Sequence, residues 1–197
     1  MHKTGESAAH PPQPTYDFPD RFPEERLREL ILYIAAQCEE EPTFGAVMLN
    51  KILWFLDASA YADTGKPITG TAYIKLPNGP VPERMQAILS RMQTEKEVFV
   101  HERERFGYKQ KRIVPLREPN LADFTAEEIA HVSKVIRALC RYTAKEVSEL
   151  SHSRAWKIAA IGERIPYEAV FLSNEPVTEA DEEWARRLQQ KYGWGTM

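Results

Sequence analysis

LNKILWFLDASAYADTGKPITGTAYIKLPNGPVP, residues 49–82, holds the most structural information in this chain of 197 residues. It begins as a strongly apolar helix, passes through the turn Gly-Lys-Pro-Ile-Thr-Gly, and continues as a short alternating strand into a second turn, Pro-Asn-Gly-Pro. Its four prolines and three glycines restrict the backbone path, and it contains no cysteine and no histidine. We therefore expect this segment to build a rigid surface and not a reaction centre.

The apolar part of this segment predicts a helix buried in the middle of the fold. We expect it to begin after Thr43, a suitable N-cap, and to end near Gly65, a natural residue just beyond a helix C-terminus. Apolar side chains surround its axis, which is typical of a helix that is covered on all sides. Its few polar or amphipathic residues share one stripe of the helix, and they are Asn50, Trp54, Asp57 and Tyr61.

This stripe has two interpretations. Buried Asn and Asp side chains persist only when they are hydrogen-bonded, so the stripe can be an internal network that satisfies a neighbouring loop. It can also be a polar and aromatic surface that contacts a partner protein. A catalytic role for Asp57 is not favoured, because no His, Lys or metal-ligand set accompanies it in sequence.

A short strand at 71–76 follows the helix. Thr71, Tyr73 and Lys75 alternate with apolar residues, so we expect this polar face, Tyr73 included, to be exposed. The next four residues, Pro-Asn-Gly-Pro, predict a tight turn, since Asn and Gly tolerate positive φ. No glycine spacing here fits a P-loop or a dinucleotide fingerprint. The residues expected to fix the turns are Gly65, Pro67, Gly70, Pro77, Gly79 and Pro80.

Further elements flank this segment on both sides. Apolar stripes predict helices at 23–39 and 82–94, and a β-hairpin follows at 98–116. We expect the short helix near 147–150 to turn Val147 and Leu150 inward. Two capping boxes mark helix starts in the C-terminal part, Thr125 with Glu128 and Thr143 with Glu146.

Together these elements predict an α+β fold that is predominantly helical. Its helical core, short strand and β-hairpin follow a winged-helix-like order. We divide the chain into a disordered or extended arm at 1–22, one domain at 23–175 and a C-terminal helix at 176–197.

Composition narrows the classes of function. The net charge of -3 does not indicate a nucleic-acid-binding protein. No apolar run approaches the roughly 18 residues of a membrane span, and no secretory signal is visible at the N-terminus. Cys38 and Cys140 lie on apolar helix faces, which favours buried, reduced thiols in a cytoplasmic protein, with a disulfide between them as the alternative. We expect no metal site and no cofactor.

Four short segments, taken in order, carry a family resemblance. They are Leu-Asn-Lys-Ile-Leu-Trp-Phe at 49–55, Gly-Lys-Pro-Ile-Thr-Gly at 65–70, Tyr73 ahead of Pro-Asn-Gly-Pro-Val at 77–81, and Glu-Leu-Ser-His at 149–152 ahead of Trp156-Lys157. In these segments the chain resembles the Panacea domain family of SocA-like antitoxins, over roughly residues 27–172. The resemblance implies a mixed, mostly helical domain and a phage-associated antitoxin that binds and neutralises a toxin encoded next to it. It also implies an alternative role, because one line of the family acts as a protease adaptor for its toxin.

We therefore predict an antitoxin, not an enzyme, that neutralises its cognate toxin by direct protein–protein binding. Tyr, Trp and Arg dominate interface hot spots, and pre-set turns lower the ordering cost of binding. For Trp54 and Trp156, packing in the core is the competing interpretation. The predicted partner-binding residues are Asn50, Lys51, Trp54, Asp57, Tyr61, Thr69, Tyr73, Asn78 and Trp156.

A winged-helix-like transcriptional regulator that binds DNA is an alternative. Three helices followed by a hairpin match its order, and residues 101–117 hold six basic and two acidic side chains. However, the third helix is poor in base-reading side chains, and the alternating Arg and Glu of the first hairpin strand are typical of cross-strand ion pairs. The predicted nucleic-acid contacts are Arg103, Arg105, Lys109, Lys111 and Arg112.

The tripeptide Ser151-His152-Ser153 invites comparison with a catalytic Ser-His pair. Neighbours in sequence rarely reach the hydrogen-bonded geometry that such a pair needs. Ser side chains also bond readily to nearby backbone groups. We therefore expect a helix cap or a turn at this point.

Overall fold

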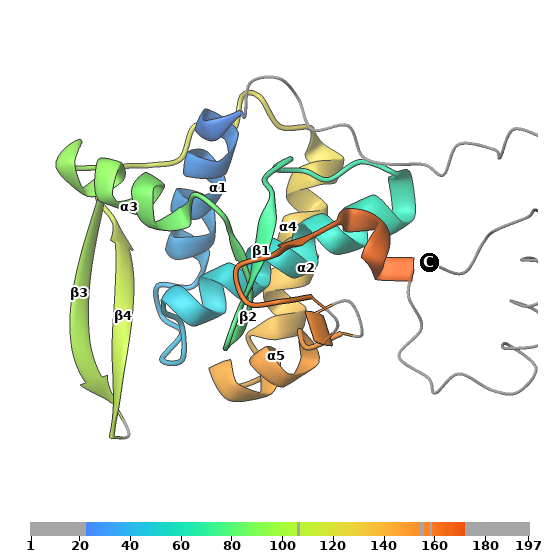
Figure 1. The fold of residues 1–197 in the computed structure, drawn as a ribbon. Helices are drawn as coiled ribbons and strands as arrows, with labels where there is room; N and C mark the ends of the chain where they lie inside the picture. Colours follow the sequence, from blue (N-terminus) through green and yellow to red (C-terminus); the bar gives the residue numbers. More distant parts are fainter. Residues whose placement is uncertain (1–22, 106, 154–155, 158, 172–197) are drawn as a thin grey trace, which may run out of the picture. The chain divides into compact units, whose positions relative to one another are not determined.

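Helix α2 (Ala46–Thr64) runs through the middle of the fold, and the other elements pack around it (Figure 1). The structure is a computed structural model, and it describes residues 23–105, 107–153, 156–157 and 159–171. These residues belong to one compact unit. The architecture is α+β and mainly helical, as predicted.

The first two helices confirm most of the sequence pattern. Helix α1 (Glu24–Gln37) buries the whole predicted stripe, including Leu27, Ile31 and Cys38. Helix α2 ends at Gly65, which adopts the left-handed conformation with φ of 73°. The predicted N-cap of α2 was wrong, because Gly45 and not Thr43 occupies that position and no side chain caps the helix.

A three-stranded antiparallel sheet lies against α2. Its strand order is β2-β1-β5, with Tyr73 at the start of the central strand opposite Pro82 on one side and Ile165 on the other. The prediction of a single strand was incomplete, and Pro82 ends a strand where we expected it to start a helix. Both prolines of β2 lie on an edge strand, where a missing N–H is tolerated. The bounds are β1 Tyr73–Leu76, β2 Gly79–Pro82 and β5 Arg164–Ile165.

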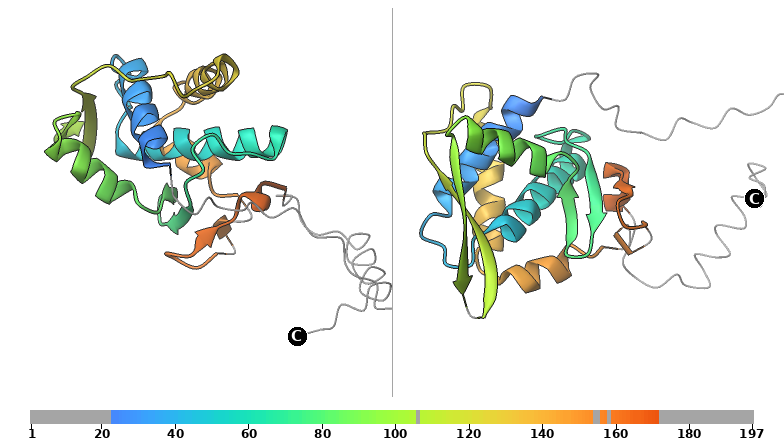
Figure 2. Two further views of the ribbon diagram at one scale, coloured as in Figure 1. Left: turned by 90° about the horizontal axis from the view of Figure 1, so that it is seen from above. Right: turned by 60° about the vertical axis from the view of Figure 1, so that its left-hand side comes forward.

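The predicted hairpin is present and extends along one side of the helices (Figure 2). Strands β3 (Val98–Arg105) and β4 (Tyr108–Pro115) pair in antiparallel register, from Val98 opposite Pro115 to Arg105 opposite Tyr108. Helix α3 (Met85–Thr94) precedes the hairpin and contacts β3, whereas β4 contacts α1 and α2. The order of three helices and a hairpin is therefore confirmed, although a β1–β2 hairpin interrupts it.

The C-terminal elements begin as their capping boxes predict. In both boxes the Thr side chain accepts from the backbone N–H three residues on, and the Glu side chain accepts from the Thr N–H. Val147 is fully buried, but Leu150 is 54% exposed, so its predicted inward orientation was wrong. The elements are α4 Ala126–Leu139, α5 Ala144–Leu150 and the 3₁₀ helix η1 Tyr167–Phe171. The predicted arm at 1–22 and the helix after 176 lie outside the described residues.

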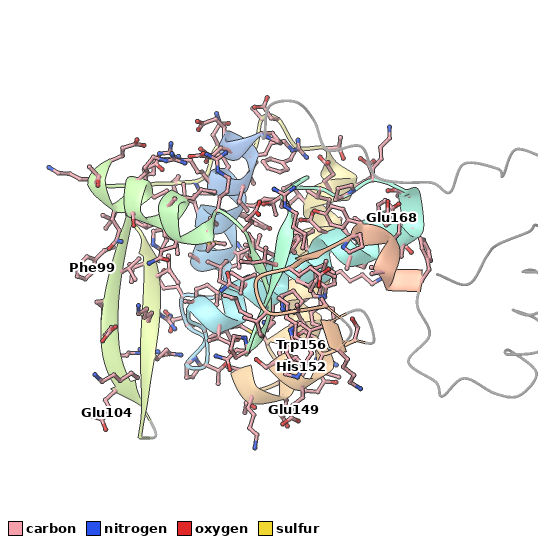
Figure 3. The ribbon with its side chains drawn as sticks, in the orientation of Figure 1. Phe99, Glu104, Glu149, His152, Trp156 and Glu168 are labelled. Carbon is pink, nitrogen blue, oxygen red and sulfur yellow. The ribbon has the colours of Figure 1, made fainter. Side chains whose placement is uncertain are left out.

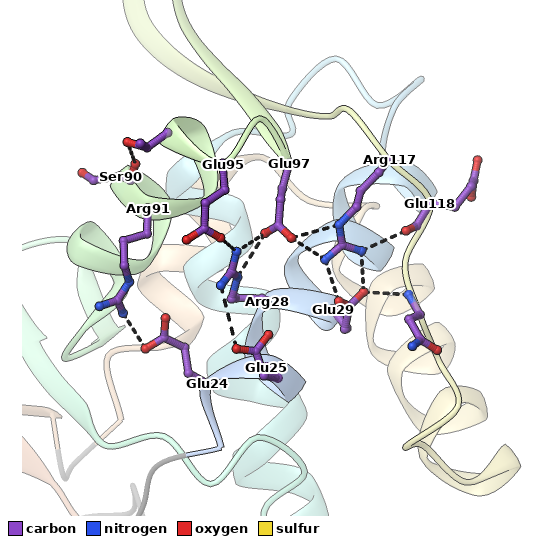
Figure 4. Close-up of polar contacts among 12 residues, drawn as sticks. Glu24, Glu25, Arg28, Glu29, Ser90, Arg91, Glu95, Glu97, Arg117 and Glu118 are labelled. Carbon is purple, nitrogen blue, oxygen red and sulfur yellow. Dashed lines mark hydrogen bonds and ion pairs between the residues drawn. The ribbon is translucent and has the colours of Figure 1, made fainter.

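An ion-pair network fastens the hairpin to α1 (Figure 4). The Glu97 carboxylate, just before β3, accepts from Arg28 of α1 at 2.6 Å and from Arg117, beyond β4, at 2.7 Å. Arg117 also pairs with Glu29 of α1 at 2.6 Å. Linked pairs of this kind have more effect than isolated surface pairs, so both ends of the hairpin are held on α1.

Within the described part of the chain, no helix combines the length and the apolar character needed to cross a membrane.

Candidate protein-binding site

The Asp57 side chain is the centre of a buried hydrogen-bond network. Its carboxylate accepts from the Thr69 backbone N–H at 2.7 Å, from the Tyr73 hydroxyl at 2.8 Å and from the Thr69 hydroxyl. The Tyr167 hydroxyl lies 3.4 Å from the same carboxylate and donates to the Thr71 carbonyl at 2.5 Å. Burial raises the pKa of Asp57, and the hydrogen bonds from Thr69 and Tyr73 oppose that rise. This network connects α2, the following loop, β1 and η1.

Aromatic rings surround the network. Trp54 meets Tyr73 edge-on, with ring centroids 5.1 Å apart, and Tyr61 stacks on Tyr167 at 5.5 Å. The Tyr61 hydroxyl donates to Glu168 of η1 at 3.2 Å. For Asp57 and Tyr61 of the α2 stripe, the structure therefore supports the internal network, whereas Asn50 Oδ1 is buried with no hydrogen-bond partner among the described residues. The expected exposure of Tyr73 was wrong, because β5 and η1 cover it and leave it 1% exposed.

A second cluster forms where α2, the β1–β2 turn and the end of α5 meet. We call Lys51, Gly79, Pro80 and Ser151 the junction. Lys51 is buried, and its Nζ donates to the Pro80 carbonyl at 3.2 Å. Gly79 has φ of 107°, and a Cβ there would lie 2.5 Å from Lys51 Nζ and closer still to Ser151 Oγ. The junction is therefore packed so closely that only glycine fits at this point.

The sequence after α5 lies against the end of β1 through a stack of side chains. The rings of His152 and Trp156 are parallel within 9°, with centroids 3.7 Å apart, and Figure 3 shows them side by side near Glu149. The Lys75 side chain also lies over the Trp156 ring, with its Nζ 4.3 Å from the ring centroid. The Trp156 indole donates to the Leu76 carbonyl at 3.1 Å. These contacts fix Trp156 beside the turn of the β1–β2 hairpin.

Two groups at this place have shifted pKa values. Burial lowers the pKa of Lys51 to about 7. Burial, followed by the nearby charge of Lys51, also lowers the pKa of His152. Both shifts favour the neutral forms, as expected where two bases share a partly desolvated region. Among the described residues, His152 Nε2 is a buried atom with no hydrogen-bond partner.

The junction lies beneath an exposed surface that is formed by α5 and the β1–β2 turn. Ser148 of α5 donates to the Asn78 carbonyl at 3.0 Å, which holds the turn against the helix. Outside this contact, Leu150, Pro77 and Asn78 are exposed, whereas the aromatic stack is partly buried. We call this set the α5–turn surface, and it consists of Pro77, Asn78, Glu149, Leu150, His152 and Trp156.

The predicted partner-binding residues therefore fall into two groups. Asn78 is exposed, and Asn50 and Trp156 are half-buried. The other six are buried and contribute to the junction or to the Asp57 network and its surrounding rings: Lys51, Trp54, Asp57, Tyr61, Thr69 and Tyr73. Sequence reasoning did not find the contributions of Lys75, Ser151 or Tyr167, since no local pattern links them to residues so far away in sequence.

The tripeptide Ser151-His152-Ser153 forms the cap and turn that the sequence predicted. Ser151 caps the C-terminus of α5, and its hydroxyl donates to the Ser148 carbonyl at 2.7 Å. The His152 backbone N–H donates to the Glu149 carbonyl at 3.1 Å. Both Ser151 and His152 thus make contacts typical of a helix end.

The basic hairpin residues differ in how much they are available to a ligand. Arg112 is 7% exposed and donates to backbone carbonyls of Glu41 at 2.6 Å and Phe44 at 3.1 Å, so its predicted contact with nucleic acid is not supported. Arg103 donates to the Pro42 carbonyl at 3.1 Å. Lys111 is exposed and pairs with Glu102 across the strands at 3.7 Å. Lys109 is also exposed, and the Arg105 side chain lies outside the described residues.

Two hollows on the surface are lined by residues outside the junction. One, of about 200 Å³, lies between α1 and the hairpin beside His101, and the other, of about 390 Å³, lies beside Cys140. In the described ranges, no group of three or more His, Cys, Asp or Glu side chains is arranged to hold a metal ion.

Comparison with known proteins gives one match. The family described as "Antitoxin SocA-like, Panacea domain" matches residues 49–157, which is more than half of the chain. No curated protein and no solved structure matched the chain. The matched range begins in α2, ends at Lys157 and contains the whole junction and the whole α5–turn surface.

Proposed function

Since the chain belongs to the Panacea-domain family of SocA-like antitoxins, we propose that it neutralises a toxin protein by direct binding through the α5–turn surface. One observation supports the choice of this surface. Segments near residues 51, 79 and 151, which are far apart in the sequence, meet at the junction beneath it. Three of the four segments that carry the family resemblance therefore meet at one place on the molecule.

The composition of this surface supports a protein partner. Leu150 is 54% exposed and apolar, and Trp156 presents a partly buried ring whose orientation is already fixed. Large side chains that are held in place before binding lose little conformational freedom on binding. Asn78 and Glu149 supply a polar rim, as protein interfaces generally have. The buried junction keeps the backbone beneath these residues rigid, and the Asp57 network holds the start of β1.

The proposed mechanism is stoichiometric occlusion. The antitoxin covers the working surface of a cognate toxin that is encoded nearby, and a standard interface of about 1,600 Å² in total is sufficient for a stable complex. This action needs no catalytic group, and we propose that it takes place in the cytoplasm. Two thiols that remain unpaired are consistent with a reducing compartment.

The test is co-expression with the product of the neighbouring gene, followed by size-exclusion chromatography and a growth assay. We expect the two proteins to co-elute and the antitoxin to restore growth. Leu150→Asp should weaken binding by about 30-fold or more, since it places a charge at an apolar contact. Leu116→Asp is the matched control, because Leu116 is 55% exposed, follows β4 directly and is not part of the α5–turn surface.

Three outcomes would contradict the proposal in different ways. If the proteins do not co-elute and growth is not restored, neutralisation by binding is wrong. If Leu116→Asp weakens the complex and Leu150→Asp does not, the α5–turn surface is wrong. If the complex forms but growth returns only while a cellular protease is active, the chain acts as an adaptor.

A further inference from the structure

The two cysteines of the chain lie at the ends of two neighbouring helices. Cys38 is the C-cap of α1 and Cys140 is the C-cap of α4. Their sulfur atoms are 3.8 Å apart, although 102 residues separate them in the sequence. Both are free thiols. A disulfide has a sulfur–sulfur distance near 2.05 Å, so about 1.8 Å remains to be closed. Residues at helix ends can move by such an amount more readily than residues inside a helix.

The two thiols differ in their access to solvent. Cys38 is fully buried, whereas Cys140 is half-buried and lines the surface hollow of about 390 Å³. Arg137 and Arg141 line the same hollow. A small oxidant can therefore reach the sulfur of Cys140 before that of Cys38.

The hydrogen bond between the sulfur atoms also makes the thiols chemically different. With the Cys38 thiol as donor, this bond lowers the pKa of Cys140 and raises the pKa of Cys38. Thiolate and not thiol attacks an oxidant, so the more exposed sulfur is also the more reactive one. Low pKa, solvent access and an adjacent second thiol are the features of cysteines that oxidise reversibly.

We propose that Cys140 and Cys38 form a reversible oxidation site, in which a hydroperoxide oxidises Cys140 and Cys38 then closes a disulfide. In the first step the Cys140 thiolate attacks one peroxide oxygen. An S–O bond forms, the O–O bond breaks, and the leaving hydroxide takes a proton to become water. The sulfur is oxidised by two electrons to sulfenic acid, and the peroxide is reduced.

In the second step the Cys38 thiol gives up its proton and its sulfur attacks the sulfur of the Cys140 sulfenic acid. The S–S bond forms and the S–O bond breaks, and the hydroxide leaves as water with the proton of the Cys38 thiol. The sum of both steps converts two thiols and one hydrogen peroxide into one disulfide and two waters. A dithiol reductant converts the disulfide back to two thiols by thiol–disulfide exchange.

The crosslink would connect the end of α1 to the end of α4. A disulfide that closes so long a loop stabilises the folded state mainly by restricting the unfolded chain. We expect the oxidised protein to unfold at a temperature roughly 5–15 °C higher than the reduced protein. The inference does not depend on the proposed toxin, since it concerns the chain alone.

The experiment treats the full-length protein with a small molar excess of hydrogen peroxide, then alkylates it under denaturing conditions. We expect the intact mass to fall by two hydrogen masses and alkylation to be lost at both cysteines. Trypsin should release residues 29–51 joined to residues 138–141, and dithiothreitol should separate them. The same treatment in urea should give much less of the linked product, because the folded state no longer holds the thiols together.

Variants assign the order of the steps. Cys38→Ser should stop the reaction at a Cys140 sulfenic acid that dimedone traps, whereas Cys140→Ser should give little oxidation. The mass measurement uses the wild-type protein, so it tests the proposal even if neither variant folds. Disulfide-linked dimers as the main product, sulfinic acid on Cys140 without a crosslink, or two unreacted thiols in the folded protein would each overturn the proposal.

Discussion

The Tyr73 hydroxyl donates a hydrogen bond to the Asp57 carboxylate at 2.8 Å, and both side chains are buried. Tyr73 begins the central strand of the sheet, and Asp57 lies in the second half of α2. The bond therefore joins the sheet to the helix that the rest of the fold surrounds. It also leaves these two residues no free surface for a partner, so their contribution to binding is indirect, through the rigidity of the backbone.

Removal of either group should lower the free energy of unfolding, but by different amounts. Tyr73→Phe takes away one of several donors and should cost about 1–2 kcal/mol. Asp57→Ala leaves the donors of Thr69 and Tyr73 without an acceptor and should cost about 3–5 kcal/mol. Urea unfolding at pH 7 measures both.

Tyr33→Phe is the matched control for Tyr73→Phe. The Tyr33 hydroxyl bonds to Ser133 at 3.0 Å, but it is only half-buried, so its loss should cost about 0.5 kcal/mol. If the two Phe variants lose the same free energy of unfolding, the buried hydrogen bond from Tyr73 to Asp57 stabilises the fold no more than a half-buried one.

Gly79→Ala tests the close packing of the junction. The new Cβ would overlap Ser151 Oγ and Lys51 Nζ, and the residue would keep a φ of 107° that L-amino acids rarely adopt. We expect a loss of about 3 kcal/mol in the free energy of unfolding, since strain and overlap act together.

Gly65→Ala isolates the effect of backbone strain. Gly65 also has positive φ, at 73°, but a Cβ there would meet nothing within 4 Å. Its substitution should cost about 1 kcal/mol. If Gly79→Ala and Gly65→Ala are equally stable, the packing of Gly79 against Lys51 and Ser151 is not tight.

Local signals predicted a large part of the fold. The stripe of α1, the left-handed Gly65 and both capping boxes depend on residues within a few positions of each other, and the structure has all of them. The β3–β4 hairpin was also predicted within one residue, because alternation and a glycine turn are local patterns.

The errors in the prediction have tertiary causes. Tyr73 looked exposed because its strand alternates, but β5 and Tyr167, about ninety residues later, cover it. Leu150 looked buried, yet the seven-residue helix α5 turns Val147 inward and leaves Leu150 in solvent. Hairpin Arg112 looked free, but its acceptors lie in the connection between α1 and α2. No window of sequence contains both partners of these contacts.

Lys51 should make stability depend on pH in an unusual direction. Burial lowers the pKa of its ammonium to about 7 from 10.5, so between these values the unfolded chain holds a proton that the folded chain has lost. The free energy of unfolding therefore rises with pH over this window, by about 2 kcal/mol from pH 7 to pH 9. Urea unfolding at both pH values measures the rise.

Lys51→Met removes this titration while it keeps most of the side-chain volume. We expect the difference in stability between the wild type and this variant to change by about 2 kcal/mol from pH 7 to pH 9, in favour of the wild type at the higher pH. This comparison cancels the other groups that titrate in the same range. Parallel pH profiles would mean that Lys51 keeps its ordinary pKa in the folded protein.

Arg112 and Lys111 are neighbours on β4 and should respond to substitution very differently. The Arg112 guanidinium donates to several carbonyls of the α1–α2 connection, including Cys38 at 3.2 Å and Phe44 at 3.1 Å. A lysine ammonium has fewer donors and lacks the planar fork, so Arg112→Lys should cost about 2 kcal/mol of stability. Lys111→Ala removes an exposed ion pair with Glu102 and should change stability by about 0.5 kcal/mol or less.

Thermal and urea unfolding distinguish these two effects, and a gel shift with upstream DNA at two salt concentrations adds a functional comparison. If the hairpin contacts phosphates, Lys111→Ala weakens DNA binding and reduces its salt dependence by about one released counterion, although stability is unchanged. Without such contacts, Lys111→Ala has no effect in either assay, and only Arg112→Lys changes the protein. A stable Arg112→Lys variant with weakened DNA binding would instead place Arg112 in a nucleic-acid interface and contradict its structural role.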